Sequence, residues 1–341
     1  MKSHGDTAKP VEVGAGKLRY RSVQGWGRLP PGYSFVDVVG VATDSNDRVY
    51  VFDRGEHPVV IFDRDGRFIG SWGEGQFVRP HGIHIGPDDS IYCTDDVDHT
   101  VRKYSLDGHL LMKMGKSGQG ADTGVIGVDY RTIRRVGPPF HRPTNLTVAP
   151  DGTLLVADGY GNARIHRFSP EGLLLHSWGS PGAGPGQFNL PHGIAVDRDG
   201  LVYVADRENN RIQVFSHSGE FLRQLTDVAR PTEVFIDSQD NVFVAEMGWK
   251  AGLFPWHVLP PGAPSGRLSI FDRKGLLLAR WGGGDDPTAP GDFFAPHDVW
   301  VDRAGDVYVA EVLKSGGFDR TLFGRDGHFL QKFARIQPSK R

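Results

Sequence analysis

Cysteine is nearly absent from this chain, which excludes an internal disulfide, because Cys93 is the only one among 341 residues. An excess of either charge is also missing, because the chain has 39 lysines and arginines and 41 aspartates and glutamates. No block of basic residues stands out, so the sequence does not indicate a nucleic-acid-binding surface. No apolar run is long enough to span a bilayer, and residues 1–13 contain no apolar core of the length a signal peptide needs. We therefore expect a cytoplasmic protein without a membrane or nucleic-acid partner.

Sustained helical periodicity is missing too, whereas glycine and proline, at 46 and 23 residues, are as abundant as a turn-rich protein requires. Short apolar runs alternate with turns. Residues 193–222 show this order, with runs at 193–197, 202–206 and 211–215 and turns at Asp199-Gly200 and Ser218-Gly219. The same order recurs at residues 44–69 and 149–172, and parts of it recur at 235–237 and 301–302. The chain is therefore built from an internal repeat.

The repeat predicts an all-β fold. Apolar runs joined by Asp-Gly, Ser-Gly and Lys-Gly turns are typical of β-hairpins. Four strands per unit, with a period of roughly 40 residues apart from insertions, indicate a β-propeller. A single blade cannot bury both of its faces, so neighbouring blades supply the core. The prediction is a six-bladed β-propeller with four antiparallel strands per blade around a central channel. An open β-solenoid is the alternative, but its coils are shorter.

The expected domain organisation follows from where the repeat begins and ends. Residues 36–335 form a single propeller domain, residues 1–35 an N-terminal segment that closes or packs on the ring, and residues 336–341 a basic C-terminal tail. Two long inserts, 115–142 and 247–266, interrupt the repeats. Because insertions on a repeat ring usually lie on one face, often the binding face, we expect the second insert, with Trp249, Phe254 and Trp256, to form a lid or pocket wall. The first is equally compatible with a tolerated surface loop.

Three histidines occupy the same position in alternate repeats. His81, His192 and His297 each follow a proline at the start of a repeat, whereas the intervening copies carry Thr144 and Thr232, and the first copy carries a valine. On a closed ring of six repeats these histidines are a third of a turn apart, so their imidazoles converge on one point. Three imidazoles with an open fourth position suit Zn²⁺, although iron, copper and nickel also accept imidazole. The alternative is a set of turn histidines that cap strands.

Other polar residues stand at the ends of predicted strands. Arg54 follows the second strand of the first repeat, where a guanidinium can bind a ligand carboxylate. Arg207 has the same position in the fourth repeat. The alternative to ligand binding is an ion pair on the surface. Tyr160 stands in the corresponding loop of the third repeat between two glycines, with a packing role as its alternative. Asp298 follows His297 and could orient a histidine, bind a second cation or act in acid–base chemistry, unless it is a plain turn aspartate.

These residues together carry a resemblance to a known family. The repeats resemble NHL repeats, and five segments resemble the lyase domain of peptidylglycine α-amidating enzyme: 52–57 (FDRGEH), 80–83 (PHGI), 157–160 (ADGY), 191–194 (PHGI) and 296–298 (PHD). That family is a six-bladed propeller that cleaves peptidyl-α-hydroxyglycine to a peptide amide and glyoxylate. The match runs from residue 36 to residue 333.

The resemblance implies a role for each matching residue. His81, His192 and His297 would hold a catalytic zinc, Tyr160 would be the general base, and Arg54 would bind or polarise close to the substrate. Asp298 and the backbone carbonyls of Val41 and Ile83 would hold a structural calcium, for which oxygen-only ligation is suitable. The chain departs from the secreted members at Gly161, where they carry a disulfide cysteine, and we expect no counterpart of their oxidative partner domain. A smaller carbinolamide therefore remains open as the substrate.

The predicted function combines these residues. A zinc-bound hydroxyl is a stronger acid than a free one, and a phenol beside a cation can take its proton, so that the C–N bond of an α-hydroxy amide breaks. The leading hypothesis is a zinc-dependent lyase that acts on a small molecule or short peptide bearing an α-hydroxy amide and releases an amide and a carbonyl product such as glyoxylate. The alternatives are a metal-dependent hydrolase or hydratase on the same propeller, and a non-catalytic NHL module that binds protein or RNA.

Overall fold

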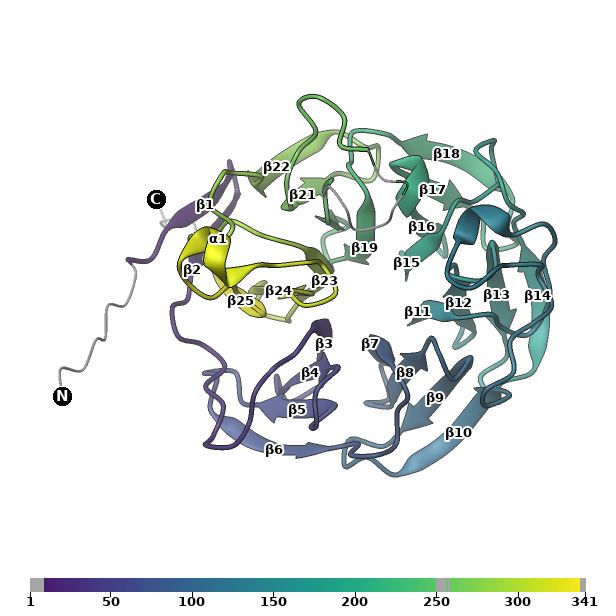
Figure 1. The fold of residues 1–341 in the computed structure, drawn as a ribbon, viewed down its shortest axis with the longest axis horizontal. Helices are drawn as coiled ribbons and strands as arrows, with labels where there is room; N and C mark the ends of the chain where they lie inside the picture. Colours follow the sequence, from purple (N-terminus) through teal and green to yellow (C-terminus); the bar gives the residue numbers. More distant parts are fainter. Residues whose placement is uncertain (1–8, 250–255, 257, 338–341) are drawn as a thin grey trace.

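The strands of the computed structural model, which describes residues 9–249, 256 and 258–337, form six sheets around one axis (Figure 1). The first blade contains β3 (Val38–Thr43), β4 (Val49–Asp53), β5 (Val59–Phe62) and β6 (Phe68–Trp72). The second contains β7 (Pro80–Ile85), β8 (Ile91–Asp95), β9 (Thr100–Tyr104) and β10 (Leu110–Gly115), and the third β11 (Pro143–Val148), β12 (Leu154–Asp158), β13 (Arg164–Phe168) and β14 (Leu174–Trp178). Each blade runs from an inner strand beside the axis to an outer strand on the rim.

The remaining blades repeat this plan. The fourth contains β15 (Pro191–Val196), β16 (Val202–Asp206), β17 (Arg211–Phe215) and β18 (Phe221–Leu225), and the fifth β19 (Pro231–Ile236), β20 (Val242–Glu246), β21 (Arg267–Phe271) and β22 (Leu277–Gly282). The sixth contains β23 (Pro296–Val301), β24 (Val307–Glu311), β25 (Leu330–Arg335), β2 (Leu18–Ser22) and β1 (Glu12–Ala15). Three short helices complete the described elements: η1 (Tyr130–Thr132), η2 (Arg207–Asn209) and α1 (Arg320–Phe323). The predicted six-bladed propeller with four-stranded antiparallel blades is confirmed, with a fifth strand on the last blade.

The hydrophobic core lies between the blades rather than at one centre. One cluster of buried side chains joins Ile165 of the third blade to Val204 and Phe215 of the fourth. A comparable cluster joins each of the remaining pairs of neighbouring blades. Second strands such as β16 are buried along their whole length because a neighbouring blade covers each face. This arrangement explains why the second strands read as unbroken apolar runs.

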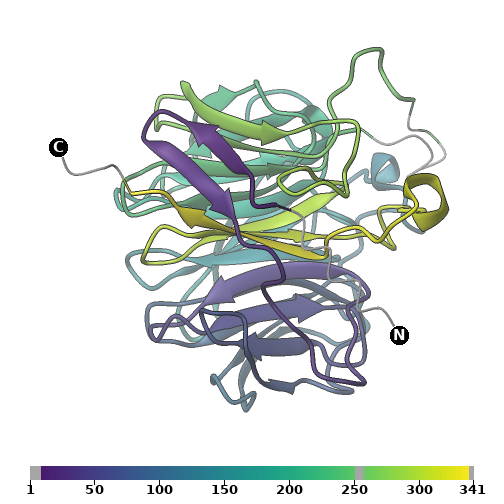
Figure 2. The ribbon, with the colours of Figure 1, turned by 90° about the vertical axis from the view of Figure 1, so that its left-hand side faces the viewer.

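Strands from both ends of the chain build the last blade. The sixth repeat supplies only β23, β24 and β25, and β2 pairs with β25 in antiparallel register, with Tyr20 opposite Arg335. Figure 2 shows β1 and β2, in purple, beside the yellow β25. The ring closes where β23 contacts β3. Residues 12–22 belong to the segment predicted to close or pack on the ring, and in the structure they are strands of the sixth blade. Without them β25 would be an unpaired edge. Residues 338–341 of the expected basic tail lie outside the described residues.

Both inserts are partly or wholly described. The first, 115–142, contains η1, whereas residues 250–255 and 257 of the second, Phe254 among them, lie outside the described part. The indole Nε1 of Trp256 donates a hydrogen bond to the Tyr130 hydroxyl at 3.1 Å, so the two inserts contact each other. No helix within the described residues has the length and apolarity that crossing a membrane requires.

Candidate metal centre and the pocket beside it

Three imidazoles meet at the axis of the ring. His81, His192 and His297 are the second residues of β7, β15 and β23, and their ring centroids lie 4.8 to 4.9 Å apart. Because each inner strand presents its second residue to the channel, the alternate positions that the repeat predicts are brought together. The potential ligand nitrogens all lie within 4.8 Å of one another.

Each histidine is held by the next blade in the same way. The Nδ1–H groups of His81, His192 and His297 donate to the backbone carbonyls of Thr144, Thr232 and Val39 at 2.7, 2.7 and 2.8 Å. The accepting residues occupy the histidine position of the intervening repeats. A donated Nδ1–H fixes the tautomer, so each Nε2 keeps its lone pair for the axis. The alternation of histidine with threonine or valine therefore builds both the ligands and their supports.

The surroundings of the histidines suit a bound metal ion. Burial, followed by the charge of neighbouring histidines or of Arg54, holds the pKa of each imidazole well below its ordinary value, so that all three are neutral. The Nε2 atom of His297 is buried and has no hydrogen-bond partner among the described residues, whereas those of His81 and His192 each lie 3.3 Å from the Tyr160 hydroxyl. Three neutral, convergent imidazoles with an unpartnered nitrogen are the donor set that zinc accepts.

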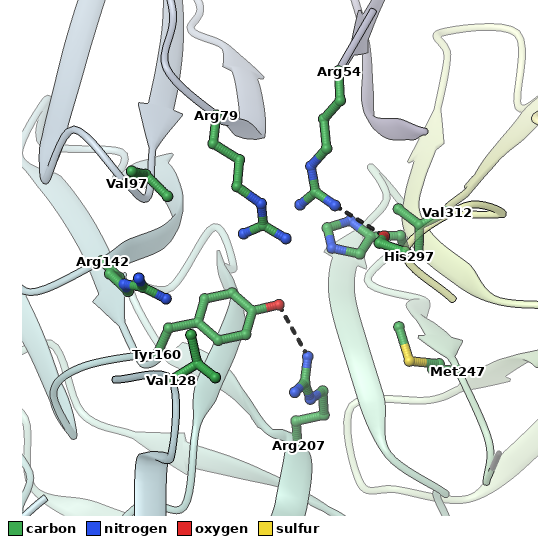
Figure 3. Close-up of a pocket in the computed structure, with 11 residues that line it drawn as sticks. Arg54, Arg79, Val97, Val128, Arg142, Tyr160, Arg207, Met247, His297 and Val312 are labelled. Carbon is green, nitrogen blue, oxygen red and sulfur yellow. Dashed lines mark hydrogen bonds between the residues drawn. The ribbon is translucent and has the colours of Figure 1, made fainter. Parts of the chain in front are cut away.

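A cavity of about 400 Å³ opens beside His297 and Tyr160 (Figure 3). The loop between the second and third strands of every blade contributes to the lining. The residues, in blade order, are Arg54, Val97, Tyr160, Arg207, Met247, and Val312 together with Ser315. Val128 of the first insert and Met247 of the second also line it, so both inserts contribute to the pocket wall. The pocket is thus a ring of equivalent loop positions whose chemistry differs from blade to blade.

Tyr160 and Arg207 act as a pair. Arg207 Nη1 donates to the Tyr160 hydroxyl at 3.2 Å, and Glu208 holds the Nε atom of Arg207 at 2.8 Å. The alternative of a surface ion pair for Arg207 is wrong, because its side chain is 2% exposed and faces the pocket. The glycines beside Tyr160 serve close packing: a Cβ atom on Gly159 would lie 2.0 Å from the Pro191 carbonyl oxygen. Sequence reasoning missed the contact between Arg207 and Tyr160, although the repeat position shared with Arg54 could have indicated it.

Arg54 approaches the same space from the first blade. Its Nε donates to the Pro80 carbonyl at 3.1 Å, its Nη1 donates to the Ser315 hydroxyl at 3.0 Å, and Asp37 lies 3.6 Å from Nη1. Its Nη2 is buried and has no partner among the described residues. Burial, followed by the charge of Arg79, lowers the pKa of the Arg54 guanidinium. A donor that is desolvated and unsatisfied points to an acceptor supplied by a ligand.

Asp298 lies away from this pocket and lines a second cavity of about 130 Å³ along the channel. Its carboxylate accepts hydrogen bonds from the backbone N–H groups of Val41 and Val299 at 2.8 and 2.7 Å. Ile83 lies close by, since a Cβ atom on Gly40 would be 2.7 Å from Ile83 Cγ2 and 3.1 Å from Asp298 Oδ2. The structure therefore brings Val41, Ile83 and Asp298 together but gives Asp298 no contact with Tyr160.

A second buried carboxylate, which sequence reasoning missed, shares that cavity. Glu233 accepts a hydrogen bond from Asn145 and one from the Val234 N–H at 3.0 Å. Burial raises the pKa of Asp298 to about 8, and burial together with the Asp298 charge raises the pKa of Glu233 well above its ordinary value. Asn145, Glu233 and Asp298 share one repeat position, which holds glycine in the other three repeats, and this shared position was the available signal.

Comparisons with known proteins agree with this architecture. A family model for the NHL repeat matches residues 140–168 and 188–215, and one described as a 6-bladed beta-propeller matches residues 36–115. Human NHL repeat-containing protein 3 is 31% identical over 314 residues, which cover 87% of this chain and 82% of that protein. The chain belongs to the NHL-repeat family of six-bladed propellers.

This NHL propeller is also homologous to amidating lyases. Peptidyl-alpha-hydroxyglycine alpha-amidating lyase 1 of Drosophila melanogaster is 34% identical over 264 residues, 72% of this chain and 45% of that protein, so the match spans less than half of that relative. Among solved structures, a gluconolactonase from Xanthomonas campestris has a TM-score of 0.60 over 98% of this chain and 99% of that chain. At 13% sequence identity, this likeness shows the fold alone.

Proposed function

We propose that this NHL propeller is a zinc-dependent carbon–nitrogen lyase. Its substrate would be an α-hydroxy amide of the peptidyl-α-hydroxyglycine type, and its products an amide and a carbonyl compound such as glyoxylate. The observation that carries the proposal is the convergence of three neutral, buried imidazoles at one point. Two of them, those of His81 and His192, lie 3.3 Å from the Tyr160 hydroxyl. The homology to peptidyl-α-hydroxyglycine amidating lyases supports the same reaction class.

The chemistry of the proposed reaction needs a base and an anion site. A bound zinc, held by His81, His192 and His297, would supply Lewis acidity that makes a substrate hydroxyl beside it easier to deprotonate. Tyr160 would take the hydroxyl proton, and the Arg207 donor 3.2 Å away would stabilise the negative charge on the tyrosine oxygen. The carbonyl forms as the C–N bond breaks; the electron pair stays on nitrogen, which receives the proton back from Tyr160. Arg54 would bind the carboxylate of the departing glyoxylate.

We further propose that the second cavity holds a structural calcium through Asp298 and the backbone carbonyls of Val41 and Ile83. Asp298 and Glu233 are buried carboxylates in one cavity with no cationic side chain lining it among the described residues. Burying charge without a counter-ion is costly, and a divalent cation would offset that cost. Such an ion would join the first, second and sixth blades. On this reading Asp298 is a structural ligand and has no acid–base role.

The test begins with metal content, measured by mass spectrometry on protein purified without a histidine tag. Wild type should carry about one zinc per chain, and His192→Ala should lose it, because three protein ligands are the usual minimum for a catalytic zinc site. His176→Ala, which changes an exposed histidine on the outer strand β14, is the matched control and should keep the metal. Absence of zinc from wild type under metal-replete conditions would contradict the proposal.

Activity is then measured as glyoxylate and amide released from α-hydroxyhippurate. Tyr160→Phe should retain zinc and lose about 10²-fold or more in kcat, the usual scale for removing a general base. Tyr203→Phe, whose hydroxyl is bound to Arg223 and Asp197 away from the pocket, should keep wild-type kcat. Unchanged kcat in Tyr160→Phe would remove the tyrosine from the reaction. Release of benzoate, ammonia and glyoxylate in place of benzamide and glyoxylate would instead support a hydrolase, because water would then have cleaved the acyl C–N bond.

The second candidate is a non-catalytic NHL module. It is favoured by human NHL repeat-containing protein 3, whose name states a repeat and no reaction. A wild-type protein that binds no metal and releases no glyoxylate would support this alternative.

A further inference from the structure

Two more guanidinium groups line the pocket of Tyr160 and have no place in the reaction proposed above. They belong to Arg79 and Arg142. Each residue precedes the proline that begins an inner strand, β7 or β11, so both stand at the end of the channel where the three histidines lie. Figure 3 shows both guanidinium groups turned into the pocket beside Tyr160. Two neighbouring blades thus add positive charge to one wall of the site.

The charges of these arginines are only partly neutralised by the protein. Arg79 Nη1 forms an ion pair with the buried Asp96 at 2.5 Å. Arg142 forms no ion pair and no side-chain hydrogen bond with any residue in the described ranges. Its backbone has φ of +66°, which L-residues seldom adopt, and its N–H donates to His99 Nδ1 at 3.1 Å. The backbone is therefore held while the guanidinium remains available to a ligand.

The pocket contains more donors than one carboxylate can satisfy. Arg54 Nη2 and Arg207 Nη2 are both buried and have no partner within the described part of the chain, and both residues line the pocket. One carboxylate accepts two parallel hydrogen bonds from a guanidinium, so it leaves Arg79 and Arg142 unused. Arg79 and Arg54 are close enough for the charge of the first to lower the pKa of the second, and the carboxylates of Asp96 and Asp37 offset part of this repulsion. A second anionic group on the ligand would relieve this repulsion.

Apolar side chains line two sides of the cavity. Val97 and Val128 line the cavity on the side of Arg142, whereas Met247 and Val312 line it on the side of His297 (Figure 3). At about 400 Å³, the cavity is at the small end of the range for small-molecule sites. It therefore suits a compact acyl group that carries its own charge.

We propose that Arg79 and Arg142 form a second anion subsite, and that the preferred substrate is a dianion, an α-hydroxyglycine whose compact acyl group bears a second carboxylate. This inference rests on the proposed lyase function, in which the first carboxylate is bound by Arg54. Arg142 is the residue to test, because Arg79 also holds the buried Asp96 and its loss would disturb the fold.

The first experiment compares two substrates that differ by one carboxylate: α-hydroxyhippurate and its para-carboxybenzoyl analogue. Wild type should have a kcat/KM about 10- to 100-fold higher for the dianion, the usual range for a charge-assisted hydrogen-bonded contact. Arg142→Met should reduce this ratio towards one, and Arg142→Lys should restore part of it. Arg134→Met, an exposed arginine in the same insert, removes the same charge and should leave the ratio unchanged. The ratio should also fall with added salt.

The second experiment does not depend on turnover. Calorimetry measures the binding of hippurate and para-carboxyhippurate, which lack the hydroxyl and cannot be cleaved. Tighter binding of the dianion by wild type, lost in Arg142→Met, supports the subsite. If the dianion binds more tightly but neither hydroxylated compound releases glyoxylate, the lyase proposal fails while the anion subsite stands. Equal binding of the two acids by wild type overturns the subsite, whether or not the hydroxylated compounds are cleaved.

Discussion

At the scale of single residues, the histidine position of the repeat has two uses. Where it holds histidine, the ring points to the axis and its Nδ1–H donates to the following blade. Where it holds Thr144 or Thr232, the hydroxyl donates to the proline carbonyl of the following blade at 3.1 or 2.9 Å. One position in the repeat therefore supplies the donor nitrogens and also connects the blades that hold them.

The acidic residue at the end of each second strand has a structural role of its own. Asp53 accepts hydrogen bonds from the backbone N–H groups of Val36, Asp37 and Gly55 at 3.0, 2.9 and 2.7 Å, and Asp95, Asp158, Asp206, Glu246 and Glu311 accept comparable bonds. These side chains fasten the loop that leads into the inner strand of their own blade. They also position the pocket residues that follow them in sequence, among them Arg54 and Arg207.

Asp53 should make stability depend on pH. Burial raises its pKa to about 6 in the folded protein, against about 3.9 in an unfolded chain. Between these values the folded state keeps a proton that the unfolded state has released, so the free energy of unfolding should fall as the pH rises from about 4 to about 6. In Asp53→Asn this contribution disappears. Urea unfolding at pH 4 and pH 7 should show wild type losing about 1–3 kcal/mol more than the variant over this range. An equal pH dependence in both proteins would contradict the assignment.

At the scale of the strand, each glycine at one inner-strand position faces a larger polar residue of an adjoining blade. Gly40, Gly82 and Gly193 leave space for the side chains of Asp298, Asn145 and Glu233 from the adjoining blade. A Cβ atom on Gly193 would lie 2.6 Å from both Cα and Oε1 of Glu233. The glycine is required by this close approach rather than by its backbone conformation.

Gly193→Ala should therefore destabilise the protein. Its methyl group would meet the backbone of β19, which cannot move away without disturbing the contact between two blades, and we expect a loss of about 2–4 kcal/mol in the free energy of unfolding. Gly70→Ala in β6 is the matched control, because a Cβ atom there meets nothing within 4 Å, and it should change stability by less than about 1 kcal/mol. Denaturant unfolding measures both. Equal effects at the two positions would show that the fit between β15 and β19 is not close.

The sequence predicts most of what is local and repeated. The spacing of turns and apolar runs indicates six blades, and the alternation of His81, His192 and His297 indicates their convergence, because both depend only on period. It does not predict that Arg207 contacts Tyr160, since the two lie 47 positions apart in loops whose directions are set by ring packing. Nor does it distinguish Arg79 and Arg142 from surface arginines. Their place beside the pocket follows only once the inner strands surround an axis.

At the scale of the whole molecule, the candidate site exists only in a closed ring. Its histidines come from the second, fourth and sixth blades, and the sixth is completed by β2 from the other end of the chain. The pairing of β2 with β25 joins residues more than 300 positions apart. In β2 the buried residues Leu18, Tyr20 and Ser22 alternate with exposed ones, a pattern that any half-buried strand shows. The sequence could therefore indicate closure without identifying the strand that provides it.

Truncation should test how far the site depends on this closure. Deleting residues 1–23 removes Leu18 and Tyr20 from a cluster that contains Trp281 and Phe333, and Tyr20 lies 5.5 Å from Trp281 between ring centroids. We expect a loss of more than about 4 kcal/mol in the free energy of unfolding, the scale of removing two buried side chains, with aggregation through the exposed edge of β25.

Deleting only residues 1–16 removes β1, whose residues are half-buried or exposed, and should cost much less. Thermal melts and size-exclusion chromatography compare the two proteins, and zinc titration should show weakened binding in the longer deletion alone. If both truncations retain wild-type melting temperature and zinc affinity, then β2 does not hold the ring closed, and the three imidazoles are kept together by contacts between the inner strands.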